Sequence, residues 1–179
     1  LIIVGAMANN FFVYKNLKIG KSLIEENTKE IIKGIYEKAK THKCEILIPE
    51  DCVVGTSFNG SGENKDLNTI IDNEIILDIG PKTNEKIKKM IDQSKTVLWN
   101  GPAGYFENEN FMNGTMFIAN VISRNTANKS LISVLGGGDT LAAINKSKNK
   151  LSFTHLSTAG GAFLEYLEGK DLPGLSVLK

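Results

Sequence analysis

Short apolar segments alternate along the chain with longer amphipathic segments, and glycine-containing turns separate many of them. The apolar segments predict strands at residues 1–4, 45–48, 75–78, 96–99, 131–135 and 152–156. The amphipathic segments predict helices at residues 7–14, 23–40, 84–93, 113–123, 139–148 and 161–168. Strands that alternate with helices at this spacing are typical of βαβ units. We therefore expect an α/β fold, a Rossmann-like doubly wound parallel sheet in three α/β/α layers, forming one domain over residues 1–179.

Three local features refine this prediction. Ser22 followed three residues later by Glu25 indicates a capping box at the start of the second helix. Residues 55–68 are rich in Gly, Ser, Asn and charge, which predicts a surface loop next to a short strand at 53–54. His155 falls inside a predicted strand and lacks nearby ligand partners, so we expect it in the core.

The composition is that of a globular protein. Of 179 residues, 41% are hydrophobic and 23% charged, which excludes wholesale disorder. The net charge is +1, so neither nucleic acid nor an anionic membrane is an expected partner. Arg124 is the only arginine, and a site with several bidentate anion clamps cannot be built from this chain alone.

The two cysteines indicate the redox compartment, and the first residues indicate whether the chain is a fragment. Cys44 and Cys52 show no metal-ligand spacing, and we expect free thiols in a reducing cytoplasm, with a single bridge as the alternative. No apolar run approaches the ~20 residues of a membrane span. Because the chain opens at Leu1 within a predicted strand, we expect it to be a fragment.

The strongest candidate site is the turn Gly136-Gly137-Gly138-Asp139-Thr140, which lies between a predicted strand and a predicted helix. Consecutive glycines let backbone N–H groups approach a phosphate, and the helix N-terminus adds partial positive charge. A carboxylate beside a phosphate is repulsive unless a cation joins them, and Mg²⁺ is the usual bridge. Alternatively, Asp139 is a plain N-cap and the glycines form only a tight turn.

Two further strand-to-helix turns would open on the same sheet edge. The segment 157–161 supplies Gly160 and Gly161, or is simply a helix entry capped by Ser or Thr. The segment 99–107 offers Asn100 as an anion donor, an apolar slot for a flat ring, and Glu107 as an acceptor for ribose hydroxyls. Its alternative is a buried tryptophan before a tight turn. Three such turns at one edge favour a nucleotide site.

Other motifs fail. Gly20-Lys21-Ser22 ends like a P-loop, but Lys15 stands where the first glycine is required. No G-x-G-x-x-G follows a strand, which counts against a dinucleotide oxidoreductase. The lysine-rich stretches 86–89 and 146–150 are expected to be solvated helix faces and ends.

Several segments together resemble the C-terminal domain of the phosphoglycerate kinase family. They are, in chain order, residues 5–9, 20–22, the strand end at Pro49 and Asp51, residues 78–81, 97–102, 106–107, 136–140 and 157–162. The resemblance covers essentially the whole chain. Two departures are Val4, where the family usually has Gly, and Ala159, which replaces the first Gly of a usual triplet.

The resemblance implies a Mg-nucleotide-binding half of a two-domain enzyme of glycolysis. The family transfers a phosphoryl group between 1,3-bisphosphoglycerate and ADP, giving 3-phosphoglycerate and ATP. By similarity, the backbone N–H groups of Gly138 and Gly161 stabilise the transferring phosphoryl group, and Asp139 meets Mg²⁺. The nucleotide-binding residues implied by similarity are Gly5, Ala6, Gly80, Asn100, Gly101, Pro102, Ala103, Phe106, Glu107, Gly137, Gly138, Asp139 and Thr140.

The resemblance also implies what the chain lacks. The family's N-terminal domain supplies an Arg-rich patch for 3-phosphoglycerate, which is absent here, and a cytoplasmic monomer is the family expectation. We expect the isolated chain to bind MgADP or MgATP weakly and to turn over little or not at all. A non-catalytic nucleotide-binding module that needs a partner chain is the first alternative, and a nicotinamide-dependent dehydrogenase is the second.

Overall fold

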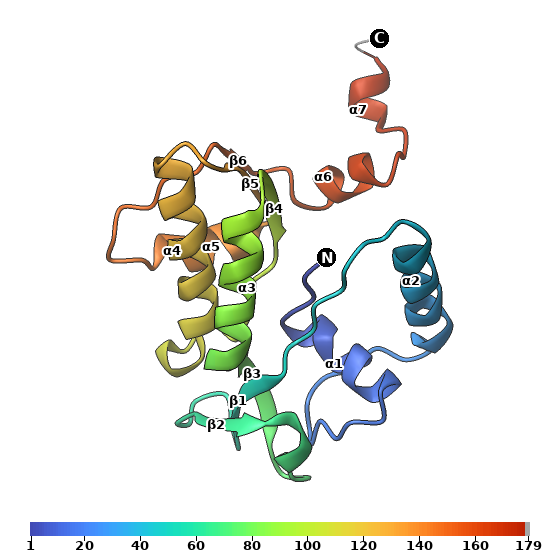
Figure 1. The fold of residues 1–179 in the computed structure, drawn as a ribbon, viewed down its shortest axis with the longest axis vertical. Helices are drawn as coiled ribbons and strands as arrows, with labels where there is room; N and C mark the ends of the chain where they lie inside the picture. Colours follow the sequence, from blue (N-terminus) through green and yellow to red (C-terminus); the bar gives the residue numbers. More distant parts are fainter. Residues whose placement is uncertain (178–179) are drawn as a thin grey trace.

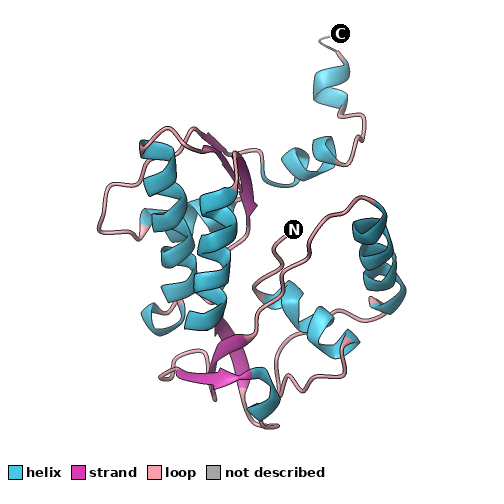
Figure 2. Ribbon diagram, viewed as in Figure 1, coloured by secondary structure: helices cyan, strands magenta, loops and turns pink. Residues whose placement is uncertain are grey.

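The computed structural model describes residues 1–177, and within them it contains two small sheets and seven helices (Figures 1 and 2). The strands are β1 (Asp51–Gly55), β2 (Glu63–Asp66), β3 (Ile75–Ile79), β4 (Thr96–Asn100), β5 (Ile132–Gly136) and β6 (His155–Ser157). The helices are α1 (Ala6–Tyr14), α2 (Lys29–Thr41), α3 (Pro81–Gln93), α4 (Asn113–Ala127), α5 (Gly138–Asn145), α6 (Gly160–Leu167) and α7 (Pro173–Ser176), with short 3-10 turns at Leu67–Thr69 and Glu109–Phe111.

The parallel sheet has the order β4-β5-β6, and its strands alternate with helices along the chain. This confirms the predicted α/β class with a parallel sheet in a single domain. Helices α3 and α4 lie side by side against it (Figure 1). On the opposite face, Leu98 and Ile132 are 46% and 55% exposed. The doubly wound arrangement with helices on both faces stays a prediction.

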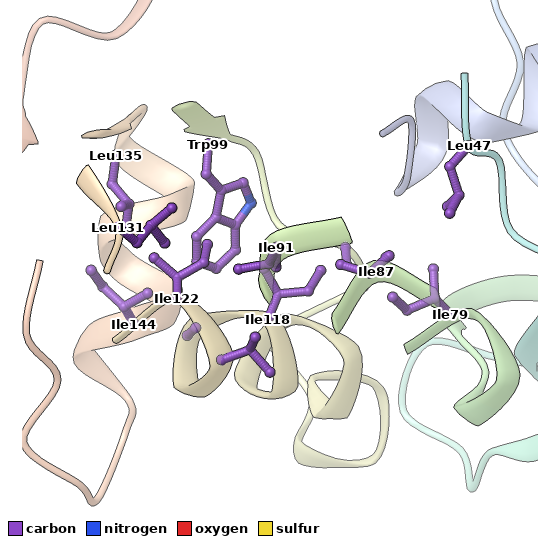
Figure 3. Packing of buried hydrophobic residues seen from close by; sticks show 13 residues of the cluster. Leu47, Ile79, Ile87, Ile91, Trp99, Ile118, Ile122, Leu131, Leu135 and Ile144 are labelled. Carbon is purple, nitrogen blue, oxygen red and sulfur yellow. The ribbon is translucent and has the colours of Figure 1, made fainter. Parts of the chain in front are cut away.

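The core beneath the parallel sheet follows from strand alternation. Trp99 and Leu135 are paired in register and point to the same face, where they are 7% and 0% exposed. Figure 3 shows Trp99 directed towards Ile91 of α3 and Ile122 of α4. Apolar residues spaced by three or four positions put these isoleucines on the inner faces of their helices.

The second sheet is antiparallel, with the order β2-β1-β3, and was not predicted. The prediction of a surface loop over residues 55–68 is wrong for β2, whose residues Glu63–Asp66 pair with β1. The sequence of β2 is entirely polar because β2 is an edge strand, and charged edges resist pairing with other chains. The short strand expected at 53–54 is the longer β1.

The two strands expected at residues 1–4 and 45–48 do not form as regular strands. Residues 1–4 and 45–48 form a single parallel bridge, between Ile2 and Leu47. Around it, Ile3 N donates to Leu47 O at 3.0 Å and Leu47 N donates to Leu1 O at 2.8 Å. The chain therefore runs extended here without a continuous ladder.

The capping box predicted at Ser22 and Glu25 is also wrong, because α2 begins only at Lys29. The segment before it is held by α1: Asn9 Nδ2 donates to Leu23 O at 2.9 Å, and Glu25 N donates to Asn10 Oδ1 at 2.9 Å. Ser22 Oγ instead accepts from Ile76 N at 2.8 Å. Tertiary hydrogen bonds thus replace the helical ones that the local pattern favours.

The last strand differs from the sequence-based expectation, whereas the two cysteines agree with it. Strand β6 is shorter than the expected 152–156, and His155 is exposed at the sheet edge rather than buried. Cys44 and Cys52 are both free, as expected. Within residues 1–177, no helix has the length and apolarity needed to cross a membrane.

Candidate functional site

Three strands end level with one another at one edge of the parallel sheet. Asn100 pairs with Gly136, and Gly136 pairs with Ser157, so the last residues of β4, β5 and β6 stand side by side. Because the strands are parallel, the turns that follow them leave the sheet from the same edge. The glycine turn after β5 and the turn after β6 are therefore neighbours.

The turn after β5 is shaped by glycine. Gly137 has φ +92°, a left-handed conformation that side chains disfavour, and its missing Cβ leaves the amide of Asn100 room at 3.2 Å. No atom lies within 4 Å of the position that a Cβ on Gly138 would take, so the space beside this residue is open. Helix α5 begins here, and its first-turn amides are unpaired within the helix. This is the backbone arrangement that binds anions.

A cavity of about 330 Å³ opens beside this edge and has mostly apolar walls. Seven of the predicted residues line it: Gly5, Ala6, Pro102, Ala103, Phe106, Glu107 and Asp139. Side chains from α1 and β3 complete the wall, including Phe12, Leu77 and Asp78. An apolar slot with a few polar groups at its rim is the usual form of a small-molecule site.

The loop 101–107 forms one wall because hydrogen bonds fasten it to three elements. Gly101 N donates to the Thr140 hydroxyl of α5 at 2.7 Å, and Ala103 N donates to the Thr115 hydroxyl of α4 at 2.9 Å. Tyr105 N donates to Leu77 O of β3 at 2.7 Å. The loop is thereby ordered without regular secondary structure.

The turn at Gly5 forms the facing wall. Gly5 has φ +65°, and a Cβ there would lie 2.9 Å from Pro102 O. Only glycine allows this left-handed turn and this approach to the loop 101–107 without strain.

The remaining predicted residues lie around the cavity rather than in its lining. Thr140 is fully buried, and its hydroxyl is engaged with Gly101 N, so it supports the wall from behind. Gly80 is the residue before α3, where its missing Cβ makes room for the Asp51 carboxylate. The other residues lie at the strand-end rim: Asn100, Gly101, Gly137, Gly138 and Gly161.

Asp139 is the candidate metal ligand. It is exposed in the first turn of α5 and lines the cavity, so its carboxylate is free to meet a ligand there. Among residues 1–177, no group of three or more His, Cys, Asp or Glu side chains could hold a metal ion. A single carboxylate suits Mg²⁺, which completes its octahedron with water and substrate phosphates.

Sequence reasoning missed two polar residues of this region. Asp78, 2% exposed, lies in the cavity wall and accepts from Gly114 N at 2.7 Å and Ile79 N at 2.9 Å. Lys146 is exposed, as expected, and its Nζ in addition donates to Phe106 O at 3.0 Å and Glu107 O at 3.2 Å. The contact of Asp78 with Gly114 and those of Lys146 with Phe106 and Glu107 have no local sequence signal, since they join residues at least 36 positions apart.

The fold and the strand-end site define an α/β protein with a ligand cavity at the carboxyl edge of its parallel sheet. The model of the family described as Phosphoglycerate kinase matches residues 1–170. The chain belongs to the phosphoglycerate kinase family. Phosphoglycerate kinase of Chelativorans sp. (strain BNC1) is 43% identical, and that of Xanthobacter autotrophicus is 44% identical, each over the full length of this chain.

Solved structures of the family agree. Phosphoglycerate kinase from Coxiella burnetii matches all of this chain with a TM-score of 0.90 and 38% identity. That from Pyrococcus horikoshii OT3 matches 99% of it with a TM-score of 0.73 and 30% identity. The chain spans 46% of the length of the two bacterial relatives and of the Coxiella structure.

Proposed function

We propose that this chain is the nucleotide-binding C-terminal domain of a phosphoglycerate kinase, over residues 1–179. The reaction is phosphoryl transfer between 1,3-bisphosphoglycerate and ADP, giving 3-phosphoglycerate and ATP in cytoplasmic glycolysis. The observation that carries the proposal is the register of the parallel sheet. It sets the glycine turns after β5 and β6 side by side, next to an apolar cavity.

The adenosine end of the nucleotide occupies the cavity. Gly5 and Ala6 line this cavity together with Pro102, Ala103 and Phe106, and its mostly apolar walls suit a flat ring. Glu107, at the exposed rim, accepts hydrogen bonds from the ribose hydroxyls. Gly80 contributes indirectly through the placement of α3.

The phosphate end meets the strand-end rim. Backbone N–H groups of Gly137, Gly138 and Thr140 point from the start of α5 toward the phosphates, and Asn100 and Gly101 flank them. Asp139 would hold Mg²⁺, which when bound neutralises phosphate charge. The donor set supports this fit, since one exposed carboxylate lies beside open space at Gly138.

The transfer itself needs positioning and charge stabilisation more than side-chain chemistry. The bond between phosphorus and the acyl oxygen of 1,3-bisphosphoglycerate breaks, and a terminal oxygen of ADP forms the new bond to phosphorus. The carboxylate of 3-phosphoglycerate leaves. Gly138 and Gly161 N–H groups, on neighbouring turns, stabilise the charge on the phosphoryl group in flight.

The acid substrate requires groups that these residues do not supply. Arg124, the only arginine, lies on α4 and pairs with Asp92 of α3 at 3.5 Å, away from the strand-end rim. The share of the relatives that this chain spans, 46%, leaves the acid site to the other part of such an enzyme. Catalysis by these residues alone is therefore slow or absent.

Because the chain spans only 46% of the relatives' length, a second candidate is a non-catalytic nucleotide-binding module that needs a partner chain. The two candidates separate when the N-terminal half of a family relative is added in trans. Restored turnover supports the kinase, whereas nucleotide binding without turnover supports the module.

Calorimetric titration of ADP, with and without Mg²⁺, tests the nucleotide site. The wild-type chain should bind ADP more tightly with Mg²⁺, and Asp139→Ala should lose that gain while keeping metal-free affinity. Asp72→Ala is the matched control, because Asp72 is a largely exposed carboxylate that lies 3.8 Å from Lys18 Nζ. Equal affinity with and without Mg²⁺ in both the wild type and Asp139→Ala contradicts the assignment.

A further inference from the structure

Helix α5 connects the two ends of the proposed site. Its N-terminus carries Gly138 and Asp139 at the phosphate end, and it ends at Asn145, followed by Lys146. Eight residues at 1.5 Å each make it about 12 Å long. A rigid helix of this length can fix the spacing between two parts of one ligand site.

The first turn of α5 is joined to the loop 101–107 through Thr140. Its hydroxyl, fully buried, accepts from Gly101 N at 2.7 Å. The indole N–H of Trp99 donates to Gly101 O at 2.7 Å, which fixes the same residue from its other side. The start of the loop is therefore held at the phosphate end.

The C-terminal end of α5 is joined to the far end of the same loop through Lys146. Its Nζ donates to Phe106 O at 3.0 Å and to Glu107 O at 3.2 Å, and lies 5.3 Å from the centre of the Phe106 ring. One ammonium group thus contacts two carbonyl oxygens and a ring face, all from consecutive residues.

Lys146 does not line the cavity, whereas Phe106 and Glu107 do. Phe106 is 8% exposed and is part of the cavity wall, and the Lys146 ammonium group contacts Phe106 without lining the cavity itself. Phe106 and Glu107 lie between two anchored positions, Tyr105, whose N–H donates to Leu77 O, and Asn108, whose Nδ2 donates to Phe58 O at 2.8 Å. Lys146 contacts the carbonyl oxygens of the two residues between these anchors.

We infer that Lys146 is a positioning residue that fixes the Phe106–Glu107 wall to the end of α5 and so sets the distance between the adenosine and phosphate ends. This inference rests on the proposed nucleotide site. It predicts that Lys146 controls affinity for the nucleoside part of the ligand without affecting affinity for the phosphate part.

Three variants test it. Lys146→Met keeps the approximate length of the side chain but removes its positive charge and its hydrogen-bond donors. Lys146→Arg keeps the positive charge and the donors. Lys148→Met is the matched control, because Lys148 is an exposed lysine in the same lysine-rich stretch. The ligands are ADP, adenosine and inorganic tripolyphosphate, each with Mg²⁺. Fluorescence of Trp99, the only tryptophan, follows binding, and calorimetry confirms each affinity.

Lys146→Met should weaken ADP and adenosine binding about three- to tenfold, since a charge-assisted contact at a partly exposed site is lost. Tripolyphosphate affinity should stay within about twofold, because this ligand has no nucleoside part to contact the Phe106–Glu107 wall. Lys146→Arg should retain most of the ADP affinity, and Lys148→Met should match the wild type.

Three results overturn the inference. They are unchanged ADP affinity in Lys146→Met, an equal loss for tripolyphosphate and ADP, and no recovery in Lys146→Arg. If the wild-type chain binds neither ADP nor tripolyphosphate, both the proposed function and the inference are wrong. Normal wild-type binding with no effect of Lys146→Met contradicts the inference alone.

Discussion

Asp78 places a carboxyl group in the interior, 2% exposed, in the wall of the cavity. Burial raises its pKa from 3.8 to about 7, although backbone N–H donors at Gly114, Ile79 and Asn113 act in the opposite direction. A Cβ on Gly104 or Gly114 would overlap this carboxylate, so both glycines are needed for it to fit. Asp78 therefore joins β3 to the start of α4 beneath the loop 101–107.

The raised pKa of Asp78 has a defined effect on stability. Between about pH 4 and pH 7 the folded chain holds a proton on Asp78 that the unfolded chain has released. The contribution of Asp78 to the free energy of unfolding is thus full below about pH 4 and falls as the pH rises to about 7. Relative to Asp78→Asn, the wild type should lose at most about 1.4 kcal/mol per pH unit over that range.

Urea unfolding of the wild type and Asp78→Asn from pH 4 to pH 8 measures this difference. Asp72→Asn is the control, because the Asp72 side chain is 94% exposed and its difference from the wild type should stay small. A wild-type minus Asp78→Asn difference that is constant across the range would show that Asp78 does not carry the raised pKa.

At the scale of elements, helix α3 begins without a capping side chain of its own, because its N-cap is Gly80. Asp51 of β1 takes that role from a distant part of the chain. Its carboxylate accepts from Lys82 N and Thr83 N, both at 2.8 Å, and from the Thr83 hydroxyl at 2.6 Å. The contact ties the antiparallel sheet to the helix layer that covers the parallel sheet.

Asp51→Ala should lower the free energy of unfolding by about 2–4 kcal/mol, because three donors at a buried helix start lose their acceptor. Asp66→Ala is the contrasting variant. Its carboxylate pairs with Nζ of the same Lys82, but both side chains are more than half exposed, and the expected loss is below about 1 kcal/mol. Thermal or urea unfolding that ranks the two variants equally would refute the capping role of Asp51.

The elements also show where sequence patterns are informative. The periodicity of apolar residues predicted α3, α4, β3 and β4 because these elements bury one face against a common core. It failed at β2, whose exposed, charged sequence has no apolar alternation. It failed again before α2, where the side chains of Asn9 and Asn10 bond the backbone of Leu23 and Glu25.

The candidate site likewise has features that the local sequence predicts and others that it does not. Glycine turns that follow strands are local features, so the sequence indicated the rim at Gly137 and Gly138. Several supports of the loop 101–107 come from residues at least ten positions away, such as Thr115 and Lys146. A contact of that kind depends on tertiary packing, which no local pattern contains.

At the scale of the whole molecule, the chain concentrates glycine turns and one free carboxylate at one sheet edge, and its single arginine lies elsewhere. Phosphoryl transfer depends on cationic groups around the moving phosphoryl, and arginine contributions reach about 10³-fold or more. In a coupled assay, the purified 179-residue chain should turn over at least ~10³-fold more slowly than a full-length family member. Comparable turnover would contradict the division of the site between two halves.

The proposed function requires that the strand ends and the cavity form one nucleotide site. Amide chemical-shift mapping of the isotope-labelled chain, titrated with MgADP, tests it most directly. We expect the largest shifts to cluster at Gly5, Gly101, Gly137, Gly138 and Gly161, on four separate turns at once. Shifts confined to the opposite edge of the sheet, around Lys129–Leu131, or the absence of any shift at saturating MgADP, would contradict it.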